Sequence, residues 1–183
     1  RQLNRQQAKD KVYLGVLSDQ LAAFGAEIIH KRLQLLQQLE KWAQAVHSEI
    51  TQEQEQLTFH YVTQVPTADQ TSVDHIYQTL QALYQQQQAK EIFQGTTLLG
   101  PHRDDLQFGV NGKNVQTFGS QGQQRTTALS VKLAEIDLMK AETGEYPVLL
   151  LDDVLSELDA ARQTHLLTAI QDKVQTFLTT PSL

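Results

Sequence analysis

The sequence feature that most constrains the fold is an apolar run ending in two adjacent acids, PVLLLDD at residues 147–153. Four bulky aliphatic residues opened by a proline predict a short strand that is buried on both faces of a parallel sheet. Asp152 and Asp153 then lie at the carboxyl end of that strand, which is where open α/β sheets bind their ligands. The pattern therefore predicts an α/β fold with two carboxylates at one edge of its sheet.

The residues alone leave two interpretations of these acids open. In the first, Asp152 holds Mg²⁺, which prefers oxygen ligands and is commonly bound by one or two carboxylates together with substrate phosphates. Asp153 then orients or deprotonates an attacking water. In the second, a buried strand simply meets solvent at an acidic turn.

A glycine-containing loop, FGSQGQQRT at residues 118–126, opens into a long helical pattern at residues 123–143. Backbone N–H groups at a helix start, the hydroxyl of Ser120 and the cation of Arg125 form a site with the size and charge for a phosphate. A lone Gly-Ser-x-Gly loop is a weak signal. Because this loop comes about twenty-five residues before the acid-ended strand, the pair favours a nucleotide site.

Three strings resemble motifs of the ATP-binding-cassette (ABC) ATPases. SQGQQR at 120–125 resembles the signature loop, LLLDD at 149–153 the Walker B strand, and SELD at 156–159 the D-loop. Within this superfamily, GPHRDD at 100–105 and the longer strings around the loop and the acids resemble the RecF family of bacterial recombination and repair ATPases. The specific resemblance covers about residues 98–180.

The resemblance implies the fold class: an α/β fold, the distal part of an ABC-ATPase head with parallel strands, helices and a β-hairpin, carrying a helical arm. We expect residues 1–95 to form the arm from a long helix, a short strand and a second helix. Residues 96–183 should form the C-terminal part of the head. Because the chain begins with Arg1 and lacks a Walker A loop, we expect a shortened form of a longer protein.

The resemblance also implies roles for individual residues. Asp152 would hold Mg²⁺, and Asp153 would be the catalytic carboxylate that acts on the attacking water. The residues implied to contact a nucleotide bound to the opposite subunit come from the signature loop and the D-loop: Ser120, Gln121, Gly122, Gln123, Arg125, Ser156 and Asp159. Thr180 would be the switch position beside the γ-phosphate.

Four positions depart from the usual pattern of the superfamily. Asp153 stands in place of a glutamate and Thr180 in place of a histidine, which predicts slow, switch-like hydrolysis. In the signature loop, Gly119 replaces a leucine and Gln121 replaces a glycine. The other matched loop residues are retained, so the resemblance still implies phosphate contact.

The cofactors implied are ATP and Mg²⁺, and the partners implied are a second copy in an ATP-dependent homodimer, gapped or double-stranded DNA, and RecR and RecO. The implied function is ATP-dependent DNA binding in replication, the SOS response and recombinational repair of single-strand gaps. Residues 95–100 have Walker A glycine spacing but lack the following Lys-Ser or Lys-Thr. We therefore expect no ATPase activity from this chain alone.

Two alternatives stay open. One is the head of another SMC-like ABC ATPase, and the other is a non-catalytic dimerisation and arm module. Composition indicates where the protein works: the chain has no cysteine, which fits a reducing cytoplasm. No apolar run approaches the ~20 residues of a membrane span, so we expect no membrane partner. A net charge of −6 disfavours a stand-alone nucleic-acid binder.

Helical periodicity predicts the two arm helices at residues 15–50 and 72–93, with a strand at 57–63 between them. The expected apolar stripe of the first helix is Leu21, Ile28, Leu35, Leu39, Trp42 and Val46, widened by Phe24, Ile29, Leu36 and Ala43. For His102, Arg103, Asp104 and Asp105, a structural turn is favoured over a ligand contact.

Short sequence patterns predict the elements that follow residue 105. Asn111-Gly112 predicts a hairpin turn between strands at 106–110 and 115–118, because both residues tolerate positive φ. Asp159 predicts a helix start, with the helix running to about Gln171, and residues 174–180 predict the next parallel strand.

Overall fold

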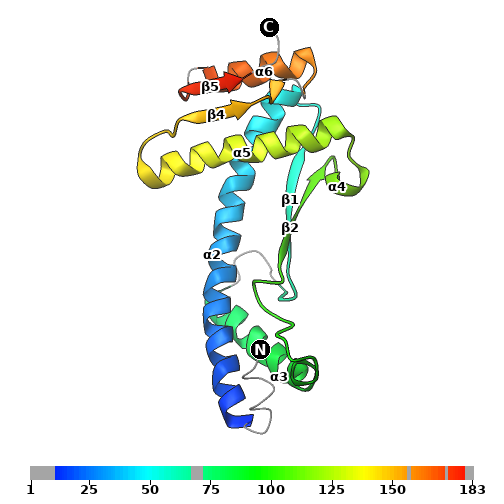
Figure 1. The fold of residues 1–183 in the computed structure, drawn as a ribbon, viewed down its shortest axis with the longest axis vertical. Coiled ribbons are helices and arrows are strands. Elements are labelled where there is room, and N and C mark those ends of the chain that lie inside the picture. The colour runs from blue at the N-terminus through cyan, green and yellow to red at the C-terminus, as the bar shows by residue number, and fades with distance from the viewer. Residues whose placement is uncertain (1–10, 67–71, 156–157, 172, 180–183) are drawn as a thin grey trace. The chain divides into compact units, whose positions relative to one another are not determined.

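The computed structural model describes residues 11–66, 72–155, 158–171 and 173–179. Its elements are drawn in Figure 1 and run in the order α2 (Lys11–Thr51), β1 (Leu57–Val62), α3 (Val73–Gln94), β2 (Asp105–Val110), β3 (Lys113–Asn114), α4 (Val115–Phe118), α5 (Gln121–Thr143), β4 (Leu149–Asp152), α6 (Ala160–Gln171) and β5 (Thr176–Thr179). The predicted helices and strands are thus confirmed to within a few residues, except for the segment after the hairpin turn.

The chain forms two compact units. The described parts of Arg1–Leu35 and Tyr61–Leu106 form the first, and those of Leu36–His60 and Gln107–Leu183 form the second. The helix α2 and the strands β1 and β2 contribute residues to both. The predicted division of the chain after residue 95 stays a prediction.

In the first unit, α3 packs against the first half of α2. Ser72 begins α3 by accepting a hydrogen bond from the backbone N–H of His75 at 3.2 Å, and Gly95 ends it in the left-handed conformation with φ 64°. The core of this unit consists of Ala22, Ala26, Ile29, Val65, Ile76, Leu80, Tyr84 and Leu99.

The predicted stripe of α2 is wrong for most of its first half, although Ile29, which belongs to the prediction, is buried as expected. Leu21, Phe24, Ile28 and Leu35 are 41–66% exposed, whereas Ala22, Ala26 and Ile29 are fully buried. The reason is close packing: small side chains let two helix backbones approach, so alanines take the contact and the larger leucines lie outside. In the second half, the residues of the stripe that are buried are Leu39, Ala43 and Val46.

By its length and composition alone, α2 could cross a membrane. This differs from the expectation that no apolar run is long enough for a membrane span. Core helices meet the same criterion, so this is weak support for a membrane helix. Within each unit, buried residues of α2 belong to an apolar core.

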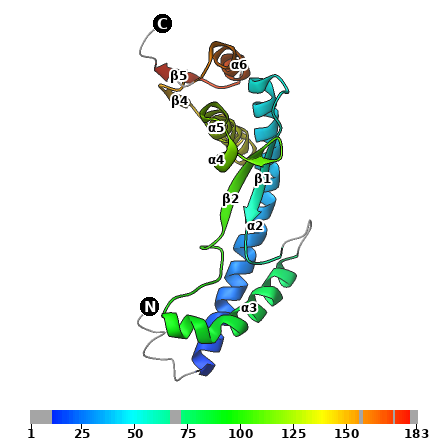
Figure 2. The ribbon, with the colours of Figure 1, turned by 90° about the vertical axis from the view of Figure 1, so that its right-hand side faces the viewer.

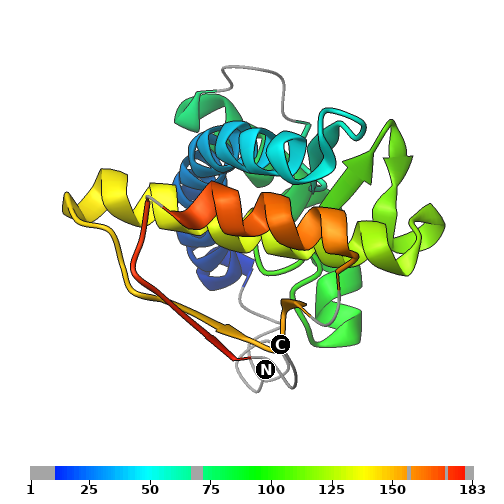
Figure 3. The same cartoon turned by 90° about the horizontal axis from the view of Figure 1, so that it is seen from above.

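In the second unit, β4 and β5 pair in parallel and α6 connects them, which gives a βαβ arrangement. The helices α5 and α6 lie on the same side of this strand pair (Figure 3). The core that they share with β4 and the end of α2 consists of Val46, Ile50, Leu129, Leu133, Ile136, Leu151, Leu158, Leu166 and Ile170.

The predicted burial of β4 on both faces is wrong. Leu151 faces the core, but Leu150 is 73% exposed, and its register partner on β5, Phe177, is 58% exposed. Successive residues of a strand point to opposite faces, and the described elements cover only the face that α5 and α6 occupy.

The turn at Asn111 and Gly112 is confirmed, with φ values of 51° and 75°. It joins β2 to a β3 of only two residues, and β1 lies on the other side of β2 (Figure 2). The predicted strand at 115–118 is wrong because these residues form the short helix α4. The Asn114 side chain accepts a hydrogen bond from the Thr117 N–H at 3.1 Å and so caps a helix instead of extending the ladder.

The segment around His102 is a turn within the first unit. The N–H of Arg103 donates to the carbonyl oxygen of Gly100 at 2.9 Å, and its guanidinium donates to the carbonyl oxygen of Thr97 at 2.9 Å. The Tyr61 hydroxyl donates to the Asp104 carboxylate. Burial, together with this hydrogen bond, raises the pKa of Tyr61 to about 12. These contacts favour the structural interpretation of the string.

We predict that Leu166→Ala lowers the free energy of unfolding by about 2–5 kcal/mol, because it leaves a cavity in a fully buried position. Leu167→Ala is the matched control, since Leu167 lies on the same helix but is 42% exposed. Chemical denaturation of both variants measures the difference, and an equal loss of stability would contradict the described packing of α6.

Candidate nucleotide-binding loops

The first candidate segment is the start of α5, which we call the Ser120 loop (residues 118–122). Ser120 and Gln123 form a capping box: the Ser120 side chain accepts from the Gln123 N–H at 3.2 Å, and the Gln123 side chain accepts from the Ser120 N–H at 3.0 Å. Ser120, Gln121 and Gly122 are exposed. The first N–H groups of a helix have no intrahelical acceptor, so those of Gln121 and Gly122 are available to an anion.

The second candidate segment is the end of β4, which we call the acidic edge (Asp152, Asp153 and Thr179). Thr179 is the register partner of Asp152 on β5, and its hydroxyl donates to the Asp152 carboxylate. The N–H of Asp153 donates to the same hydroxyl oxygen at 3.0 Å. Asp153 has φ 52°, a strained conformation for a residue other than glycine, and such strain is frequent at functional sites.

The third candidate residue, Asp159, begins α6. Its carboxylate accepts a hydrogen bond from the Arg162 N–H at 2.9 Å, which confirms the predicted helix start. The Asp159 carboxylate also lies 3.4 Å from the Nε atom of Arg162. Ser156, Glu157 and Thr180 lie outside the described residues, so the predictions for Ser156 and Thr180 stay predictions.

The guanidinium of Arg162 joins the starts of α5 and α6. One terminal nitrogen donates to the Gly122 carbonyl oxygen at 3.3 Å and to the Thr126 hydroxyl. The other terminal nitrogen donates to the Glu55 carboxylate at 3.1 Å. Together with its Nε contact to Asp159, Arg162 therefore holds three segments of the second unit at once.

Glu55 extends this network to α2. Its second carboxylate oxygen lies 3.1 Å from Nε2 of His47, which is fully buried, and Nδ1 of His47 lies 3.0 Å from the Ser130 hydroxyl on α5. A carboxylate only accepts hydrogen bonds, so Nε2 of the ring carries a proton. Burial lowers the pKa of His47, although the neighbouring Glu55 carboxylate acts in the opposite direction.

Sequence reasoning missed the connecting residues Arg162, Glu55, His47 and Thr179. Arg162 and Glu55 are far apart in the chain, and each looks like an ordinary surface charge. One signal was available: Thr126 and Ser130 are polar residues at helical spacing with the apolar residues Leu129 and Leu133. The structure shows that both polar residues are fully buried. Buried polar groups require partners, which would have directed attention to this face.

The acidic edge suits Mg²⁺ only if water and substrate phosphates supply most of the ligands. Among residues 11–66, 72–155, 158–171 and 173–179, no three His, Cys, Asp or Glu side chains gather into a metal-binding cluster. Mg²⁺ commonly uses one or two carboxylates and completes its shell with water and substrate phosphates. The exposed carboxylate of Asp152, positioned by Thr179, fits that mode.

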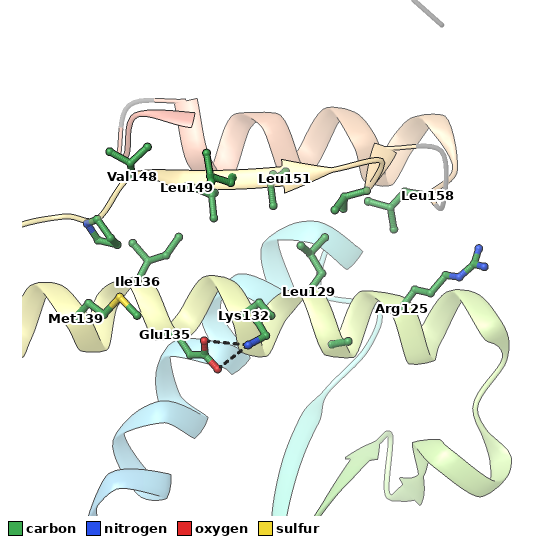
Figure 4. Close-up of a pocket in the computed structure, with 14 residues that line it drawn as sticks. Arg125, Leu129, Lys132, Glu135, Ile136, Met139, Val148, Leu149, Leu151 and Leu158 are labelled. Carbon is green, nitrogen blue, oxygen red and sulfur yellow. Dashed lines mark hydrogen bonds and ion pairs between the residues drawn. The ribbon is translucent and has the colours of Figure 1, made fainter. Parts of the chain in front are cut away.

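A cavity of about 490 Å³ lies between α5 and β4 (Figure 4). Leu129, Ile136 and Leu151 are among the mainly apolar residues that line it, and Arg125 lies at one end. Apolar walls cannot satisfy a triphosphate, whose oxygens need donors and cations. We therefore place the candidate nucleotide contacts at the helix starts and not in this cavity.

The chain is similar to solved structures, among them two of RecF. One is a structure of the recombination mediator protein RecF with ATP in the RecFOR pathway, with a TM-score of 0.82 and 32% identity over 94% of this chain and 46% of the other. The second, of RecF-ATPrS in the same pathway, has a TM-score of 0.83 and 30% identity over 99% of this chain and 49% of the other. Both have the ABC-ATPase fold, so the predicted fold class is confirmed.

No family model matches the chain, but curated relatives do. DNA replication and repair protein RecF of Latilactobacillus sakei is 70% identical over the whole chain, and that of Limosilactobacillus reuteri is 66% identical. The chain spans about half the length of these relatives. Along its whole length, the chain therefore matches proteins named RecF at high identity.

We predict that the stability of the chain falls as the pH falls below about 6.5, with a slope from His47 of at most about 1.4 kcal/mol per pH unit. The folded pKa of His47 is lowered, so between that pKa and the unfolded value the unfolded chain binds the extra proton and gains stability. Chemical denaturation at several pH values measures this slope, which His47→Gln should remove.

The control is His60→Gln, at an exposed position of the same unit. An equal loss of slope in that variant would contradict the assignment of the pH dependence to His47.

Proposed function

We propose that this chain supplies one half of the shared nucleotide site of an ATP-dependent DNA replication and repair protein of the RecF type. Its RecF relatives are named for replication and repair, and its structural neighbours hold ATP or ATPrS in the RecFOR pathway. The observation that carries the proposal is the capped, exposed Ser120 loop at the start of a 23-residue helix.

In this proposal, the Ser120 loop is a signature loop that contacts ATP bound to a second copy of the protein. The helix start supplies N–H groups, Ser120 a hydroxyl and Arg125 a positive charge, and all three suit phosphate oxygens. Gln121, Gly122 and Gln123 shape the same surface, and Arg162 links Asp159 to it. In this proposal, Ser156 and Asp159 belong to a D-loop. ATP then stabilises a homodimer, because the loop's anion affinity is satisfied only when two heads meet.

The acidic edge is, in the same proposal, the end of a Walker B strand. Asp152 holds Mg²⁺ in the full-length protein, and Mg²⁺ supplies charge neutralisation at the phosphates. Asp153 accepts a proton from, or orients, the attacking water. Asp153 and Thr180 replace the glutamate and histidine usual in the superfamily, so we expect slow hydrolysis that serves as a switch for binding gapped or double-stranded DNA. RecR and RecO are the proposed partners, in the cytoplasm.

We expect Asp152→Asn to reduce Mg²⁺-dependent ATP hydrolysis at least about tenfold in a full-length RecF protein that carries this sequence. The amide removes the charge but retains an oxygen that can accept from Thr179, so the fold should persist. Asp105→Asn, at an exposed position of β2, is the control. Unchanged hydrolysis in Asp152→Asn would reject the metal assignment, whereas the absence of hydrolysis in the unsubstituted full-length protein would favour a module that only makes protein contacts.

We expect Ser120→Arg to abolish ATP-induced dimers of the same full-length protein in sedimentation experiments. The large cation occupies the space in which a phosphate would approach the helix start. Ser72→Arg is a matched control, because Ser72 also caps a helix and its loss also costs about 1 kcal/mol. Persistence of the dimer in Ser120→Arg would overturn the proposed contact in trans.

A further inference from the structure

Ser120, Gly122 and Asp159 are exposed, so their own side chains do not share in the apolar core, although Leu158 beside Asp159 packs in the same core as Leu129 of α5. The described polar contacts that join the Ser120 loop and Asp159 converge on one side chain. Arg162 reaches the Gly122 carbonyl oxygen at 3.3 Å on α5 and the Asp159 carboxylate at 3.4 Å before α6. A planar guanidinium donates in fixed directions, so these contacts set a distance and an angle together.

We propose that Arg162 is a positioning residue: it fixes the Ser120 loop and Asp159 as one preformed surface for the nucleotide of the partner subunit. This inference rests on the proposed function and adds a residue that the family resemblance did not assign. Arg162 touches no nucleotide in this scheme. It acts through the backbone of Gly122, the hydroxyl of Thr126 and the carboxylate of Asp159.

Glu55 makes the position of Arg162 stable. The side chain of Arg162 is 22% exposed and that of Glu55 is 10% exposed, so each charge is largely removed from water and requires the other. Glu55 is held in turn by the fully buried His47, whose other ring nitrogen contacts Ser130 on α5. Replacing the Glu55 charge should therefore release Arg162 without touching either loop directly.

A second ion pair of the same unit lies away from the proposed site and provides a comparison. Lys173 lies 2.6 Å from the Asp137 carboxylate, and their side chains are 32% and 16% exposed. Lys173 and Asp137 belong to neither the Ser120 loop nor the start of α6. Lys173→Gln is therefore a matched control for the loss of a half-buried ion pair away from the proposed site.

The experiment compares Arg162→Gln, Glu55→Gln and Lys173→Gln in a full-length RecF protein that carries this sequence. Two quantities are measured for each: the affinity of the monomer for ATP by fluorescence titration, and the dissociation constant of the ATP-bound dimer by sedimentation. We expect Arg162→Gln and Glu55→Gln to weaken the dimer by about tenfold or more, since charged hydrogen bonds are lost. Monomer affinity for ATP should be unchanged, and Lys173→Gln should change neither quantity by more than about threefold.

Arg162→Lys keeps the charge but loses the forked geometry, and it should weaken the dimer to an intermediate degree. It also serves as the test variant if Arg162→Gln does not fold. A dimer constant for Arg162→Gln and Arg162→Lys equal to that of Lys173→Gln would overturn the positioning role, as would an equal loss of monomer ATP affinity. If Ser120→Arg leaves the dimer intact, the proposed function fails first, so the two failures are distinguishable.

Discussion

The guanidinium of Arg162 connects the exposed starts of α5 and α6 by direct polar contacts. The starts of α5 and α6 carry exposed polar residues, Ser120 and Asp159, so the apolar core behind the helices does not contact these side chains directly. Arg162 supplies directional bonds to both segments, and Glu55 compensates its charge in a position that is mostly shielded from water. The polar network therefore joins the candidate loops directly, and the apolar core holds the helices behind them.

The apolar core explains why the candidate loops are exposed and yet lie at defined positions. The apolar faces of α5 and α6 meet Leu151 of β4, and Leu166 is fully buried among them. A close-packed core fixes the axes of both helices, and each helix then presents its N-terminus at a defined place. The acidic edge follows from the same packing, because β4 ends at Asp152 beside Thr179 of β5. The apolar face that carries Leu150 and Phe177 stays open among the described residues.

Much of the fold was predictable because its signals are local. The capping box of Ser120 and the turn at Asn111 and Gly112 depend on residues that are close in sequence. Errors arose where a choice depended on distant residues. The exposed face of β4 and the buried alanine face of α2 depend on which elements lie opposite, and periodicity cannot tell which of two apolar faces is covered. The segment after Asn114 became a helix because a side-chain cap competed with strand pairing.

The sequence by itself determined the helices α2, α3, α5 and α6, most of the strands, the loop with Ser120 and the acids that end β4, since each depends on short-range capping, turn or periodicity rules. It also gave the resemblance to RecF, which the comparisons confirmed. Only the tertiary structure decided that Arg162, Glu55 and His47 meet, and that Thr179 holds Asp152. These contacts join residues up to 107 positions apart, and chain distance carries no information about which charges will pair once the core has formed.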